Sequence, residues 1–184
     1  MSTSHSLYVQ IPIAHPDLAA VLDSPASPCE LNDNWREWWA SRDILSNYEL
    51  IDIPIYRQAR YRDIVQNMTT DGYMLCKSWY DSDTQYWHVV ALQFAENYIE
   101  ILPFLAFIHD LAKHSQAGRI GHAVLFDYLW SDKHVMAYLK IENQEVHLSP
   151  FRYTGELPDD FIETARNALS AWMGELRHQG QQPS

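Results

Sequence analysis

Glycine is scarce in this sequence, with six residues among 184. None of the six builds the spacing GxGxxG or GxxxxGK[S/T], in which glycine lets the backbone approach a phosphate group. The sequence also lacks the GxSxG turn of serine hydrolases, the HExxH helix of zinc proteases and the protein-kinase signature. These absences disfavour dinucleotide, nucleotide and serine-hydrolase chemistry, and we expect no cofactor.

Cysteine and long apolar runs are scarce as well. Cys29 and Cys76 lie far apart and form no CxxC motif, which is typical of free thiols in a reducing compartment. The longest apolar stretch, Ile99 to Ile108, is too short to span a bilayer and contains Pro103. The first ten residues contain no basic stretch followed by an apolar run, so we expect no secretory signal. The sequence therefore predicts a cytoplasmic protein that does not enter a membrane.

Positive charge is outnumbered, since 13 Lys and Arg face 24 Asp and Glu. The formal net charge is −11 and the isoelectric point is about 5.1. A negative field repels nucleic-acid phosphates and attracts basic surfaces, and it also keeps a protein soluble. We expect no direct contact with nucleic acid and, if the charge serves binding, a basic protein partner.

The composition that is present is globular, with 47% hydrophobic and 20% charged residues, and the length fits one domain, 1–184. Helical spacing of apolar residues predicts helices over 33–46, 57–68, 97–115 and from Pro158 onward. Alternation predicts strands over 73–80, 85–94, 122–130, 135–141 and 146–151. The order predicts an α+β fold, a mainly antiparallel sheet of about five strands packed against about four helices on one face.

The two ends of the chain are predicted to be less regular. Four prolines punctuate residues 1–30, so we expect an irregular N-terminal segment that packs on the body of the domain. Residues 178–184 are polar and follow the last apolar stripe, which predicts a flexible tail.

Three tryptophans fall close to one face of the first predicted helix, at positions 35, 38 and 39. One interpretation makes Trp35 and Trp38 a surface anchor for a partner, with the acidic residues Asp33, Glu37 and Asp43 around it. The other makes the same indoles part of the core, which is the ordinary role of an apolar helix face. The sequence leaves both interpretations open.

Histidine is abundant, with nine residues, and one histidine segment carries a metal-site pattern. The stretch from Phe107 to His114 reads FIHDLAKH, which resembles the core motif of HD-family phosphohydrolases. In that resemblance His109 and Asp110 match the His-Asp dyad and Lys113 the lysine that follows it. The resemblance implies a divalent metal that activates water against a phosphate ester. Its implied ligands are His88, His109, Asp110 and His122, with Asp127 or Asp160 as the distal aspartate. The alternative is an ordinary polar pair at the wet end of a buried helix.

Small acidic α+β domains without catalytic motifs commonly bind and cover a basic surface of another protein. The sequence therefore favours a non-enzymatic binding protein, and among these an immunity- or antitoxin-like inhibitor. An adaptor or accessory subunit of a larger assembly is the third interpretation, and the sequence does not separate it from the inhibitor.

Overall fold

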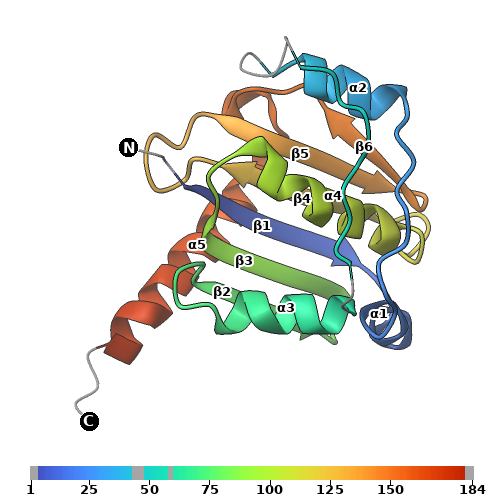
Figure 1. The fold of residues 1–184 in the computed structure, drawn as a ribbon. Coiled ribbons are helices and arrows are strands. Elements are labelled where there is room, and N and C mark those ends of the chain that lie inside the picture. Colours follow the sequence, from blue (N-terminus) through green and yellow to red (C-terminus); the bar gives the residue numbers. More distant parts are fainter. Residues whose placement is uncertain (1–3, 43–47, 58–59, 181–184) are drawn as a thin grey trace.

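A single sheet organises the fold. The computed structural model describes residues 4–42, 48–57 and 60–180. Within these residues the sheet has six strands, all antiparallel, in the order β2-β3-β1-β4-β5-β6 (Figure 1). The strands are β1 (His5–Pro12), β2 (Cys76–Asp81), β3 (Tyr86–Ala95), β4 (Ile120–Phe126), β5 (Val135–Glu142) and β6 (Glu145–Ser149). The predicted α+β fold with an antiparallel sheet is confirmed, with one strand more than expected.

β1 lies in the middle of the sheet, hydrogen-bonded to β3 on one side and to β4 on the other. The expectation that residues 1–30 are irregular is therefore wrong for this strand and for the helix α1 (His15–Leu22) that follows it. The strand was missed because both its faces are buried: Leu7 packs on one side of the sheet and Tyr8 on the other. Such a strand lacks the alternation of polar and apolar residues that reveals a half-exposed one. Pro16 sits in the first turn of α1, where a missing N–H costs no helical hydrogen bond.

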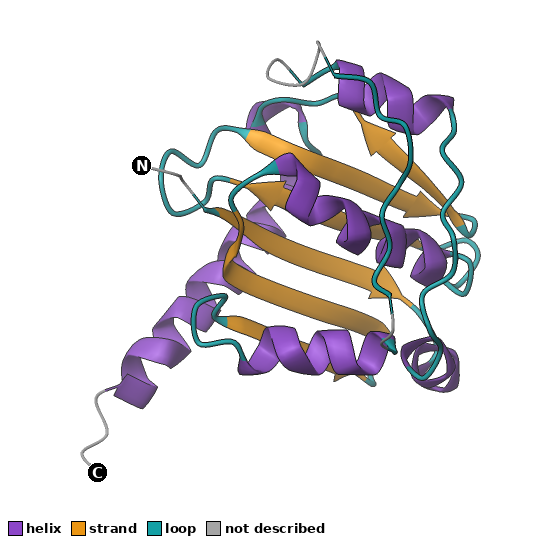
Figure 2. Ribbon diagram, in the orientation of Figure 1, coloured by secondary structure: helices purple, strands orange, loops and turns teal. Residues whose placement is uncertain are grey.

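Four helices cover one face of the sheet (Figures 1 and 2). They are α1, α2 (Asp33–Ala40), α3 (Tyr61–Thr70) and α4 (Tyr98–Ala112). α4 runs across the middle of this face and is buried on nearly all sides, and Pro103 lies inside it without ending it. Leu50 and Ile53, from the segment 48–57, join the same core cluster.

The last helix, α5 (Asp159–Gly180), is the one helix of the described residues that covers the opposite face, and it lies behind the sheet in Figure 1. Phe161 and Leu169 of α5 pack there on Tyr8 and Val124 in a second core cluster. The expectation of helices on one face only is therefore wrong, because the strands turn apolar side chains to both faces and both must be covered. The helix runs to Gly180, so residues 178–180 of the predicted tail are helical, and the rest of that prediction falls on residues 181–184, outside the described part.

The turns follow the chemistry of the sequence. Asn143 and Gln144 link β5 to β6 with φ values of 51° and 66°, as a two-residue hairpin of this twist requires, which confirms the turn predicted there. A short 3-10 turn, Thr154–Glu156, precedes α5. Among the described residues, none of the helices combines the length and the hydropathy needed to cross a lipid bilayer.

Candidate functional site

α2 is held firmly against the sheet edge. The side chain of Asn32 accepts a hydrogen bond from the backbone N–H of Trp35 at 3.1 Å and so caps the helix. The Asn34 side chain both accepts from the backbone N–H of Leu148 and donates to its carbonyl, each at 2.8 Å. Leu148 belongs to the edge strand β6, so this one amide fixes the helix and also occupies open backbone groups of the edge.

This docking buries the tryptophans of α2. Trp35 and Trp38 have no exposed surface, and Trp39 is buried too. Trp35 stacks on His109 of α4 with ring centroids 4.8 Å apart, and Trp38 meets Trp35 edge to face. The interpretation of Trp35 and Trp38 as a surface anchor is therefore corrected, because the indoles form the layer between α2 and α4. The core interpretation is the one that the structure shows.

The acidic residues of α2 remain on the outside. Asp33 and Glu37 are exposed on the side of the helix away from the core. Asp33 forms an exposed ion pair with Arg36 at 3.3 Å, of a kind that contributes little to stability. Asp43, the third acidic residue predicted at this site, lies outside the described residues. Of the predicted binding residues, Asp33 and Glu37 are thus on the surface, whereas Trp35 and Trp38 are not.

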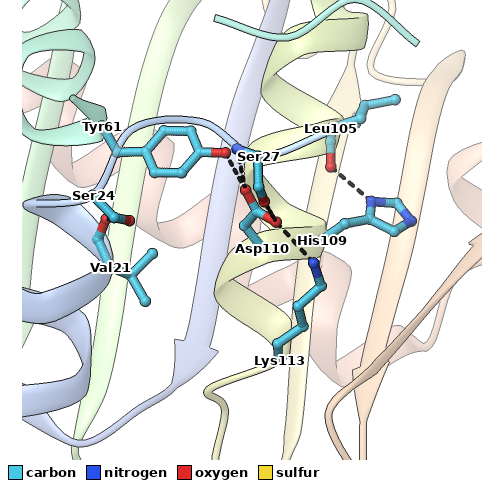
Figure 3. Close-up of polar contacts among 8 residues, drawn as sticks. All are labelled: Val21, Ser24, Ser27, Tyr61, Leu105, His109, Asp110 and Lys113. Carbon is cyan, nitrogen blue, oxygen red and sulfur yellow. Dashed lines mark hydrogen bonds and ion pairs between the residues drawn. The ribbon is translucent and has the colours of Figure 1, made fainter. Parts of the chain in front are cut away.

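Asp110 is the centre of a polar network (Figure 3). Its carboxylate accepts hydrogen bonds from the Tyr61 hydroxyl, from the Ser27 hydroxyl at 2.7 Å and from the Lys113 ammonium at 3.0 Å. Burial alone would raise the pKa of Asp110, but these donors outweigh burial and the pKa is lowered. Because Ser27 follows α1 and Tyr61 opens α3, the network ties three helices of one face together.

His109 points away from Asp110 in Figure 3. Its Nδ1 donates to the carbonyl of Leu105, one turn earlier in α4, at 2.7 Å. Burial lowers the pKa of His109, so the ring is kept neutral against Trp35. The side chains of His109 and Asp110, which match the HD motif in sequence, therefore have different partners and do not form a common site.

The other implied metal ligands lie on the far face of the sheet. His122 stacks on Phe161 of α5 with centroids 4.3 Å apart, and His88 lies within 3.3 Å of the Tyr8 hydroxyl on the same face. Burial lowers the pKa of His122 to about 4 and also lowers that of His88. The sheet separates both from His109, on the α4 face. The HD-type assembly is thus corrected, and in the described part of the chain no three His, Cys, Asp or Glu side chains converge for a metal ion.

The two cysteines are poorly placed for nucleophilic chemistry. Both are free, and Cys76 is buried. Burial raises the pKa of Cys29 to about 11 and that of Cys76 to about 12. The thiolate is the reactive form, so both thiols stay protonated and unreactive near neutral pH.

One surface combines exposed apolar side chains with exposed carboxylates. Ile51 is 82% exposed and Ile99, in the first turn of α4, is 58% exposed. With Tyr48, Glu49 and Asp52 they border a pocket of about 490 Å³. We call these five residues the Ile51–Ile99 surface. The remaining wall and floor are Trp39, Leu50, Pro54 and Leu102, and none of the described lining residues is basic.

The Ile51–Ile99 surface is built by the same packing that buries α2. The Trp39 indole N–H donates to the carbonyl of Tyr48 at 2.8 Å, which fixes the segment 48–57 beside the helix. Leu50 and Ile53 then turn inward, and Ile51 and Asp52 turn outward. No local pattern predicts the exposure of Ile51 or Ile99, because an apolar residue among apolar neighbours is expected to be core.

Comparison of the chain with protein-family models, with curated protein sequences and with solved structures finds no match in any of the three.

Proposed function

We propose that this chain is a non-enzymatic acidic protein of the cytoplasm that binds a basic surface of a partner protein, as an immunity- or antitoxin-like inhibitor does. The observation that carries the proposal is the Ile51–Ile99 surface, where two strongly exposed isoleucines and two carboxylates border one pocket. Exposed apolar side chains that cluster are the usual mark of a protein contact. The carboxylates select a partner whose rim is basic.

The electrostatics of the whole chain support the same partner. The formal net charge of −11 gives a field that speeds the approach of a basic protein and repels an acidic one. The exposed Asp33 and Glu37 of α2 extend the acidic area from the neighbouring helix. α2 adjoins the Ile51–Ile99 surface, since Trp39 belongs to α2 and lines the pocket of that surface.

The proposal is tested by co-purification of the full chain from its native cells, followed by identification and purification of the protein recovered. We expect one basic protein in a fixed ratio, with an affinity that falls steeply as salt is added. A large assembly of many subunits would favour the adaptor instead. Recovery of no basic partner, or binding that salt leaves unchanged, contradicts the proposal.

A matched pair of variants locates the contact. The double variant Glu49→Gln with Asp52→Asn removes two charges from the Ile51–Ile99 surface. The control, Asp83→Asn with Glu145→Gln, removes two exposed charges elsewhere, one from the β2–β3 turn and one from the start of β6. We expect the first to weaken binding about tenfold, which is about 1.4 kcal/mol, and the control to change it far less. Equal effects of the two would mean that only the net charge matters and not this surface.

A further inference from the structure

The connection between β4 and β5, residues 127–134, presents an indole to solvent. Trp130 is 64% exposed, and it is the only exposed tryptophan of the seven, all of which lie in described residues. Leu129 beside it is exposed as well. We call this connection the Trp130 turn. A large apolar ring in water is unfavourable for an isolated protein, and tryptophan is the side chain most enriched in the energetic centres of protein contacts.

The Trp130 turn is rigid because Asp127, itself buried, holds it from inside. One carboxylate oxygen accepts the backbone N–H groups of Lys133 at 2.8 Å and His134 at 2.9 Å, and the other accepts the Ser131 hydroxyl. The backbone carbonyl of Asp127 accepts the N–H of Trp130 at 2.9 Å. A turn organised in this way loses little conformational entropy on binding, so its exposed ring is prepared for a partner.

A second segment, around Thr154, supports the turn. The N–H and the hydroxyl of Thr154 donate to the carbonyls of Lys133 and Asp132, both at 2.9 Å. The exposed ring of Tyr153 consequently lies beside His134, with centroids 5.5 Å apart. Two chain segments therefore hold the turn, and the second carries an exposed aromatic ring of its own.

Acidic residues outnumber basic residues near the Trp130 turn. Arg166 of α5 pairs with Asp132 at 2.8 Å and with Glu163 at 2.7 Å, which brings the start of α5 next to the turn. The same region carries further exposed carboxylates, namely Glu156, Asp159 and Asp160. The region also carries three cations, Lys133 in the turn, Arg152 and Arg166, against the five carboxylates named, so its net charge is negative, as at the Ile51–Ile99 surface.

The two surfaces are neighbours in space. A pocket of about 210 Å³ is lined by Tyr98, which precedes Ile99 in α4, and by His134 and Tyr153 from the turn side. Arg42 and Arg152 also line this pocket, and both guanidinium groups donate to backbone carbonyls of the fold. One partner can therefore contact both surfaces at once.

We infer that the Trp130 turn is a second anchor for the same basic partner, whose apolar pocket receives the Trp130 indole inside a basic rim. The inference rests on the proposed function, since it deepens it by assigning a further contact to that partner. It predicts that binding energy is concentrated in one indole that contributes nothing to the core.

The test uses full-length chains that carry the photo-reactive residue p-benzoylphenylalanine in place of Trp130, of Ile99 or of Ile120. Ile120 is the control, an exposed apolar residue at the opposite end of β4. We expect irradiation of native cells to join positions 130 and 99 to one and the same basic protein, and position 120 not to. Cross-linking from 99 without 130 overturns the inference and leaves the proposed function standing. A basic partner joined to neither position overturns the inference and the assignment of the contact to the Ile51–Ile99 surface. Cross-linking of position 130 to a second copy of this chain assigns the turn to self-association and overturns the inference.

The cross-linked protein, once purified, gives the quantitative arm. Trp130→Ala should weaken its binding by about 30-fold or more, as expected of a central indole, whereas Ile120→Ala should leave it within about twofold. Unchanged unfolding of Trp130→Ala in urea shows that the loss is one of contact and not of fold. Affinity unchanged in Trp130→Ala overturns the inference.

Discussion

The tryptophan side chains of α2 are buried, whereas the tryptophan of the Trp130 turn is exposed to solvent. In α2, Trp35 and Trp38 are fully buried and meet other aromatic rings, so their apolar area stabilises the fold. In the turn, Trp130 is 64% exposed and the surrounding hydrogen bonds hold the backbone while leaving the ring outside. In this fold the indole cluster on a helix belongs to the core. The lone indole in a polar turn lies on the surface, where a partner can contact it.

The strongest test of the comparison is Trp38→Ala. Removing a fully buried indole takes away apolar contacts and leaves a cavity, so we expect the free energy of unfolding to fall by about 3–5 kcal/mol. Urea denaturation followed by circular dichroism measures it. Trp38→Phe serves as control and should cost clearly less, because a ring remains in place. A loss below about 1 kcal/mol for Trp38→Ala would contradict the description of α2 as core.

The next largest effect is expected where the Trp130 turn meets the interior. Asp127→Ala leaves the N–H groups of Lys133 and His134 without their carboxylate, and we expect a loss of about 1–3 kcal/mol in the free energy of unfolding. Asp127→Asn keeps an acceptor oxygen and should lose less. Limited proteolysis reports the local change, with faster cleavage between residues 127 and 134 in the alanine variant. Unchanged proteolysis would show that the carboxylate does not hold the turn.

Much of the fold was predictable, and the misses have physical causes. The four helices predicted after residue 30 are present, because periodic apolar spacing is a strong local signal, although α2 ends at Ala40, short of the predicted residue 46. β1 was missed because its burial on both faces depends on a helix far along the chain, α5. The strand predicted over 122–130 ends at Phe126, because Asp127 captures the N–H groups of Lys133 and His134 and turns the chain out of the ladder. That hydrogen bonding exposes Trp130, and no local pattern in the sequence reveals it.

The histidine pattern failed for a related reason. His109 and Asp110 are neighbours in sequence, but consecutive residues of a helix diverge, and the partners of each are set by different segments: Leu105 and Trp35 for one, Tyr61 and Ser27 for the other. Spacing along a sequence predicts a metal site only when the fold returns every ligand to one side of the sheet.

The pH dependence of stability gives a further test of the core around α2, because His109 packs on the buried ring of Trp35. Burial lowers the pKa of His109 below the value of 6.5 that an unfolded chain gives, although Asp110 nearby opposes the shift and Lys113 adds to it. As the pH falls, His109 takes up a proton in the unfolded chain before it does so in the folded one. The contribution of His109 to the free energy of unfolding is therefore complete above about pH 6.5 and is lost as the pH drops below that value. His109→Gln keeps a donor toward the Leu105 carbonyl and cannot titrate. We expect the variant to lose less stability between pH 6.5 and 4.5, by at most about 1.4 kcal/mol for each pH unit. Identical pH slopes in urea denaturation would contradict it.

The smallest change in the free energy of unfolding is expected for Trp130→Ala, and it tests directly whether the exposed indole differs from the buried one. Trp130→Ala removes an exposed ring that makes no core contact, so we expect the free energy of unfolding to stay within about 0.5 kcal/mol of the unchanged chain. Urea denaturation of this variant and of Trp38→Ala, under one set of conditions, compares the same substitution in the two settings. If Trp130→Ala costs as much as Trp38→Ala, the indole is part of the structure and is not free to anchor a partner. If the cost is near zero, the exposed ring has no role in folding, and binding is the property left to explain why so large an apolar side chain stands on a turn that Asp127 holds rigid.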